Sequence, residues 1–183
     1  MRLKKLGIWF LAIFLFATHV WVRSASADEP SHSWKQMTSR SKDCQIAFPS
    51  QPQVIQRALK VSEEGHMLTY DIYLAPLHRD ALCLLLVATY PAPMTQGNAV
   101  AGLEGLLNGI LGHNPESKMT FAKVIDLKGN PAVDFLIQSP TSYFRGQALM
   151  VGSKLFLIAL EGRADQFEEK VFTRFAETFS LLP

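Results

Sequence analysis

Two short segments that are apolar at almost every position, residues 82–90 and 155–160, constrain the fold of this chain most strongly. A strand that is covered on both faces is a short continuous apolar run of this kind, whereas a helix is longer and usually shows a polar face. Pro91 ends the first segment, and Gly152-Ser153 makes a tight turn just before the second. Both segments are therefore predicted to be central strands of a sheet with further structure packed on both faces.

Six other segments are expected to be strands, most of them because apolar and polar side chains alternate along them. They are residues 44–48, 55–61, 68–74, 119–125, 133–137 and 143–151. Residues 103–111 repeat leucine and isoleucine at helical spacing, which predicts a helix with Asn98 as its cap and Gly112 at its end. A second helix is expected from Asp165, with Glu168 completing a capping box.

Strands that follow one another through turns, with only two helices among them, indicate an α+β fold. We expect a mostly antiparallel sheet of about six to eight strands, flanked by one central and one C-terminal helix. The expected globular domain is single and covers residues 42–183. A polar lead-in at residues 28–41 precedes it, from which Trp34 is expected to dock on the domain.

The first 27 residues have the pattern of an export signal. Basic residues at 2–5 are followed by an apolar run at 6–22 and by the small residues 25–27. Cleavage is expected between Ala27 and Asp28, and the alternative is an uncleaved N-terminal anchor. Either outcome places the rest of the chain outside the cytoplasm, in the periplasm or the extracellular space.

The charge balance argues against a nucleic-acid partner. Residues 1–27 contain four of the 18 lysines and arginines and no acid, which leaves 14 basic residues against 16 acidic ones. Scattered basic residues at this balance create no field that would attract nucleic acid or an anionic membrane. The sequence contains no glycine-rich phosphate loop and no helical histidine pair, so neither a cofactor nor a metal is expected. No membrane span is expected after signal cleavage.

Two cysteines, Cys44 and Cys83, both lie on predicted strands. In an oxidising compartment two cysteines of one domain can form a disulfide. Because cysteine is also among the most buried residue types, a pair of buried free thiols is the alternative. The spacing does not decide between them, since a bridge depends on the distance between the two Cα atoms.

The best candidate for a binding loop follows the apolar strand at residues 82–90. Residues 90–94 are apolar and stiffened by two prolines, and the alternative is a loop that folds back over the core. A second candidate region begins at residue 143. The candidate binding residues are Tyr90, Pro91, Pro93, Met94, Tyr143 and Arg145.

Several turn and core positions follow the pattern of a known group of exported domains. They are Phe48-Pro49 with Pro52, Gly129-x-Pro131-Ala132, Arg145-Gly146-x-Ala148, Val151-Gly152, Leu155-Phe156, Gly162 and Phe175-x-x-x-Phe179-x-Leu181. On these residues the chain resembles, over about residues 42–183, the small exported proteins with the PsbP-like fold. That group includes the extrinsic photosystem II protein and DcrB-type envelope proteins. The resemblance implies an antiparallel sheet between helices and a binding or scaffolding role, and it transfers no catalytic residue.

Three classes of function follow from these observations. The first is a non-enzymatic exported module that binds an envelope protein or a small ligand. The second is an envelope enzyme whose site is assembled from distant residues, drawn from His66, His113, Asp134 and Arg145. The third is a structural role through an exposed sheet edge. The sequence leaves the ligand and the oligomeric state open.

Overall fold

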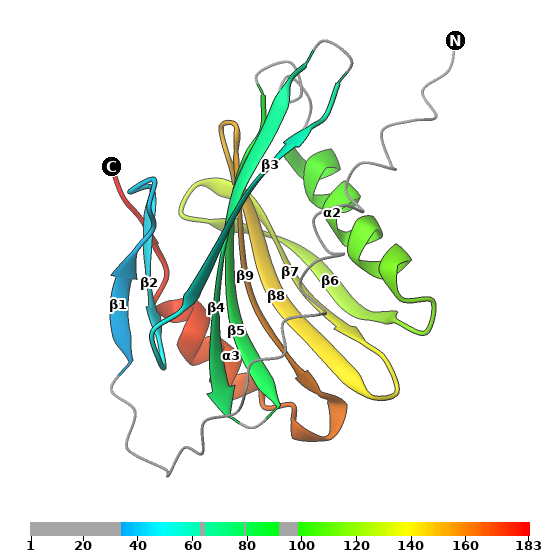
Figure 1. Cartoon of the computed structure of the whole chain (residues 1–183). Coiled ribbons are helices and arrows are strands. Elements are labelled where there is room, and N and C mark those ends of the chain that lie inside the picture. The colour runs from blue at the N-terminus through cyan, green and yellow to red at the C-terminus, as the bar shows by residue number, and fades with distance from the viewer. Residues whose placement is uncertain (1–33, 63–64, 79, 92–98) are drawn as a thin grey trace, which may run out of the picture.

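A seven-stranded antiparallel sheet forms the middle layer of the molecule (Figure 1). The computed structural model describes residues 34–62, 65–78, 80–91 and 99–183. In sheet order the strands are β3 (Gln53–Lys60), β4 (Met67–His78), β5 (Ala81–Thr89), β9 (Lys154–Arg163), β8 (Ser142–Val151), β7 (Asn130–Gln138) and β6 (Lys118–Leu127).

The two continuous apolar segments lie at the centre of this sheet, as predicted. Strands β5 and β9 pair directly with each other, with Leu85 opposite Ile158. Leu84 and Leu157 are buried on one face of the sheet, and Leu85 and Ile158 on the other. Burial on both faces is what requires apolar side chains at successive positions.

Helix α2 (Ala99–His113) covers one face of the sheet and contacts β6, β7 and β8 (Figure 1). Its buried side chains are Leu103, Leu106, Leu107 and Ile110. They are four of the five residues whose spacing predicted the helix, and the fifth, Leu111, is partly buried against the same core. The sequence therefore located both the element and its inner face.

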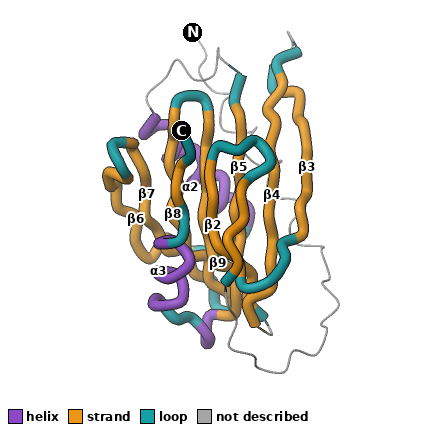
Figure 2. The backbone as a smooth tube through the Cα atoms, turned by 90° about the vertical axis from the view of Figure 1, so that its left-hand side faces the viewer, coloured by secondary structure: helices purple, strands orange, loops and turns teal. Residues whose placement is uncertain are grey.

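The opposite face carries a second, smaller layer (Figure 2). It consists of the three-stranded sheet β1 (Lys35–Thr38), β2 (Cys44–Phe48) and β10 (Ser180–Leu181), together with helix α3 (Glu169–Glu177). Phe172 and Phe175 of α3 are buried, and the Phe175 ring lies 5.4 Å from that of Phe48 and 5.8 Å from that of Trp34. The three layers enclose one core cluster on each face of the central sheet.

The start of the domain differs from the sequence expectation. Residues 35–38, which were expected to belong to a polar lead-in, pair with β2 as an antiparallel strand. Trp34 packs on α3, as expected. The folded part therefore extends upstream of residue 42, because backbone pairing makes a strand here from residues whose side chains are mostly exposed.

The prediction for the start of the last helix was wrong. Residues 164–166 form a short 3₁₀ turn, and α3 begins only at Glu169. Asp165 forms an ion pair with Arg163 at 2.9 Å, and Glu168 precedes the helix without a side-chain capping hydrogen bond. The predicted capping box is therefore not formed.

Gly146 allows β7 and β8 to pack tightly. It pairs with Phe135 of β7, and a Cβ atom at this position would lie 2.6 Å from a ring carbon of that phenylalanine. Only glycine leaves room for this ring in the core beneath α2. The α+β fold with a mostly antiparallel sheet between helical elements is confirmed.

Candidate functional site

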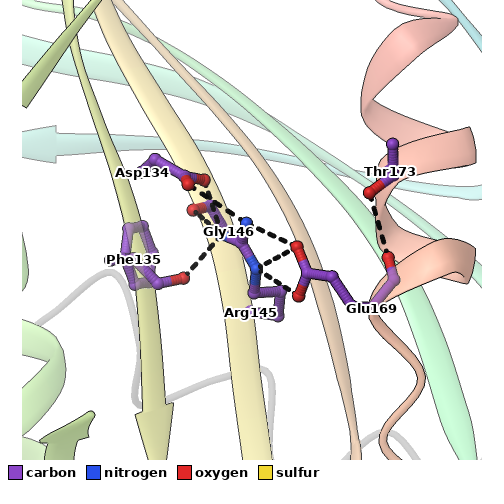
Figure 3. Close-up of polar contacts among 6 residues, drawn as sticks. All are labelled: Asp134, Phe135, Arg145, Gly146, Glu169 and Thr173. Atoms are coloured by element: carbon purple, nitrogen blue, oxygen red, sulfur yellow. Dashed lines mark hydrogen bonds and ion pairs between the residues drawn. The ribbon is translucent and has the colours of Figure 1, made fainter. Parts of the chain in front are cut away.

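The most polar buried group in the described part of the chain is the guanidinium of Arg145 on β8 (Figure 3). Arg145 is only 4% exposed and lies on the sheet face that packs against α3. Its position follows from strand alternation, because Tyr143 and Leu149 of the same strand are buried in the same cluster. A buried arginine is rare unless it is paired, so its partners determine its role.

Two carboxylates and two carbonyl groups surround this guanidinium (Figure 3). Nη1 and Nη2 of Arg145 donate to the Asp134 carboxylate of β7 at 2.6 and 3.1 Å. Nε and Nη2 donate to the Glu169 carboxylate at the start of α3, at 2.9 and 2.8 Å. Nη1 also donates to the carbonyl oxygens of Phe135 and Gly146, at 2.9 and 3.1 Å. All three nitrogens of the guanidinium are thus engaged.

Aromatic rings complete the surroundings of Arg145. Its guanidinium carbon lies 4.1 Å from the ring centroid of Phe172 on α3 and 5.0 Å from that of Phe121 on β6. A guanidinium over the face of a ring at these distances is attracted by the negative π face. Arg145 therefore connects four elements, β6, β7, β8 and α3.

The electrostatic balance at this site keeps Arg145 charged. Burial alone would lower the pKa of Arg145, but the hydrogen bonds and charges of Glu169 and Asp134 outweigh burial and raise it. The carboxylates differ in exposure, with 21% for the side chain of Asp134 and 50% for that of Glu169. A permanently charged guanidinium with every nitrogen occupied is suited to hold elements together rather than to transfer protons.

A second candidate feature is strand β6, one of the two outer strands of the central sheet. We call residues 118–128 the β6 edge. Phe121 and Val124 are 38% and 59% exposed, and both are among the large apolar side chains that reach solvent. Three exposed lysines, Lys118, Lys123 and Lys128, are spread along the same edge. Among the described residues none of these lysines forms an ion pair. This edge therefore combines apolar surface with unneutralised positive charge.

A small hollow of about 210 Å³ lies where β5, β8 and β9 meet a turn. Its lining includes Asp80, Glu161 and Arg163. Arg163 lies 3.8 Å from Asp80 and donates to the Asp165 carboxylate at 2.9 Å. Burial raises the pKa of Glu161, and the charge of His113 opposes that shift. Because Arg163 is already paired with Asp80 and Asp165, it is not free to bind an anion, which makes this hollow a weaker candidate.

The predicted binding residues lie on two different sides of the central sheet. Tyr143 and Arg145 belong to the face that carries α3, and the Tyr143 ring contacts that of Phe167 at 4.9 Å. Tyr90 is buried in the cluster beneath α2, and its backbone nitrogen donates to the Ser153 carbonyl at 2.8 Å. Pro91 is half-buried beside it. Two further predicted residues, Pro93 and Met94, lie outside the described residues.

Of the four residues considered for an assembled enzyme site, the structure brings only Asp134 and Arg145 together. His66 lies at the turn between β3 and β4, where its Nδ1 is 2.8 Å from the hydroxyl of Ser62. His113 is the last residue of α2. Neither the aromatic partners of Arg145 nor its ion pair with Glu169 could be predicted from the sequence, because these contacts join residues far apart in the chain.

Cys44 and Cys83 are both buried and both free in the structure. They lie in the same core cluster, on the face of the sheet that carries α3. Burial raises the pKa of both thiols, that of Cys44 to about 11.

Within residues 34–62, 65–78, 80–91 and 99–183, no group of three or more histidine, cysteine, aspartate or glutamate side chains is arranged to bind a metal ion. None of the helices found there is both long and apolar enough to cross a membrane.

Known structures resemble this arrangement, although no protein-family model and no curated protein sequence matches the chain. The solution structure of cyanobacterial PsbP from Synechocystis sp. PCC 6803 matches 87% of this chain and 99% of its own, with a TM-score of 0.56 and 11% identity. The fold is PsbP-like. A Pseudomonas aeruginosa protein of unknown function matches 82% of this chain and 98% of its own, with a TM-score of 0.50 and 11% identity. At these identities the likeness establishes the fold and leaves function unassigned.

Proposed function

We propose that this PsbP-like domain is an exported, non-enzymatic binding module that docks a protein partner of the cell envelope. The signal pattern of residues 1–27 supports export. The observation that supports binding most directly is the β6 edge. Phe121 and Val124 are exposed there, on the outer strand of the sheet.

The comparison with the other sheet edge strengthens this proposal. Strand β3 is also an outer strand, but its apolar residues Val54, Ile55 and Leu59 are partly buried and pack against the two core clusters. Edge strands are usually kept polar or covered, because exposed apolar edges invite association. Of the two outer strands, only β6 carries large exposed apolar side chains; Met67, the other such side chain in the described part of the chain, lies on β4. This difference supports the proposal that the β6 edge is kept for a partner.

The geometry around Arg145 favours binding over catalysis. Its guanidinium is fully used in holding Asp134 and Glu169, which leaves no donor for a substrate anion. The alternative, an envelope enzyme assembled from distant residues, would require this ion network to open when substrate arrives.

Two measurements test the proposal. Cell fractionation with intact-mass analysis should find the chain outside the cytoplasm and beginning at Asp28; a cytoplasmic chain that retains residue 1 would contradict export. In-cell cross-linking and affinity capture should then recover one envelope protein with the parent chain and less of it with Val124→Thr. The control is Thr173→Val, which changes an exposed residue of α3. Equal recovery from all three chains would contradict docking at β6.

A further inference from the structure

We infer that the β6 edge binds an extended acidic segment of its partner, which adds to the central sheet as an eighth strand beside β6. This inference rests on the proposed binding function and identifies the chemistry of the partner. Strand addition to an open sheet edge is a common mode of peptide recognition, in which backbone hydrogen bonds provide affinity and alternate side chains provide specificity.

The backbone of β6 is suitable for this addition. Strand β6 is last in the sheet order and pairs, among the described strands, with β7 alone. A register shift between Met119 and Phe121 interrupts the pairing with β7 near the start of the strand. From Phe121 to Leu127, every residue then pairs with β7 in regular register. Because a regular strand alternates its backbone groups, this segment presents outward N–H and C=O groups on its unpaired side.

The side chains of this regular segment define what the added strand must carry. Phe121, Lys123 and Ile125 share the face that carries α3, since they pair with Leu136, Asp134 and Ala132. Directly opposite side chains on neighbouring strands interact most strongly. A segment that fits this face therefore places an acidic side chain opposite Lys123 and apolar side chains opposite Phe121 and Ile125.

The charge of the β6 edge favours an acidic occupant over a second copy of this chain. Lys118, Lys123 and Lys128 are exposed, whereas Asp126 is the only acid of the edge. The carboxylate beside Lys123 on β7 is that of Asp134, which is bound to Arg145. Two such edges side by side would bring lysines close to one another and repel. Lysines on edge strands commonly prevent self-association in this way. An acidic segment turns the same lysines into attractive partners.

The experiment uses the ¹⁵N-labelled chain, purified in the form in which cells export it. The probe is the capped heptapeptide Thr-Val-Thr-Glu-Thr-Val-Thr, which places valine, glutamate and valine on one face. The same peptide with lysine at its centre is the matched probe. Amide shifts at millimolar peptide should be confined to β6 and β7 and absent with the lysine peptide. Lys123→Glu should weaken binding about fivefold, whereas Arg57→Glu, on the opposite edge strand, should leave it unchanged.

Each other outcome overturns the inference. Shifts centred on β3, equal binding of both peptides, or no shifts at all would show that β6 does not take an acidic strand. Shifts of β6 amides that depend on protein concentration without peptide would show that a second copy occupies the edge. A different result would contradict the proposed function, namely an in-cell capture experiment that recovers no partner protein. A captured partner together with a silent peptide titration would remove only this inference.

Discussion

Replacing Arg145 with methionine should destabilise the fold strongly, because a buried charge would be removed from two carboxylates that face it. Breaking a buried ion pair by deleting one partner costs about 3–5 kcal/mol. The side chains of Asp134 and Glu169 are 21% and 50% exposed, so water can solvate both after the change. We therefore expect a loss of about 3 kcal/mol, at the lower end of that range.

Urea unfolding followed by circular dichroism measures this loss. With a denaturant slope of about 2 kcal/mol per molar, a loss of about 3 kcal/mol lowers the unfolding midpoint by about 1.5 M. A double-mutant cycle separates the two carboxylates. The coupling of Arg145 with Asp134, probed by Asp134→Asn, should be about 2 kcal/mol, because both groups are largely buried. The coupling with Glu169, probed by Glu169→Gln, should be below about 1 kcal/mol, because that carboxylate is half-exposed.

Two results would refute this reasoning. One is Arg145→Met within about 0.5 kcal/mol of the parent chain, the range of ordinary surface changes. The other is a larger coupling for Glu169 than for Asp134, which would mean that exposure does not control the strength of these ion pairs.

Three further predictions follow from the packing. Gly146→Ala should lower the free energy of unfolding by about 1–3 kcal/mol, since the added methyl group would meet a phenyl carbon of Phe135 at 2.6 Å. Gly102→Ala, in α2 with no atom close to the added methyl group, should raise it by up to about 1 kcal/mol. Equal changes for the two variants in urea unfolding would contradict this packing. Burial raises the pKa of Glu161, because it favours the neutral carboxylic acid over the carboxylate. The stability that this side chain contributes is therefore full below the ordinary glutamate pKa and is lost as the pH rises through the raised pKa of the folded protein. Glu161→Gln should thus stabilise the fold at pH 7 and not at about pH 3, in paired urea titrations; a pH-independent difference would show that burial is not the cause. Cys44 and Cys83 should give the same intact mass before and after reduction and react slowly with iodoacetamide in the native state; a gain of two hydrogens on reduction would reveal a bridge.

The regular elements could be predicted because their signals are local. Helix α2 follows from leucines at helical spacing, and β5 and β9 from continuous apolar runs. Strand β1 could not be predicted in this way. Residues 35–38 are mostly exposed and become a strand through pairing with β2, which no local pattern encodes. The start of α3 was misplaced because Asp165 pairs with Arg163 instead of capping the helix.

The candidate sites depend on contacts between distant segments. Arg145 was among the predicted binding residues, yet its carboxylate partners lie 11 and 24 residues away along the chain. Charge alone did not distinguish Glu169 from an ordinary acid at a helix start. The β6 edge is apparent only from the sheet order, because an alternating sequence does not indicate which strand lies outermost.

Site-specific photo-cross-linking in cells tests the central claim, docking of an envelope partner on β6, most directly. A photoreactive residue at Val124 samples this edge, and the same residue at Gln56 samples the opposite edge strand β3. Our account predicts one cross-linked envelope protein from Val124, reduced by Lys123→Glu, and none from Gln56. The same cross-linked protein from both positions, or from Gln56 alone, would contradict docking on β6.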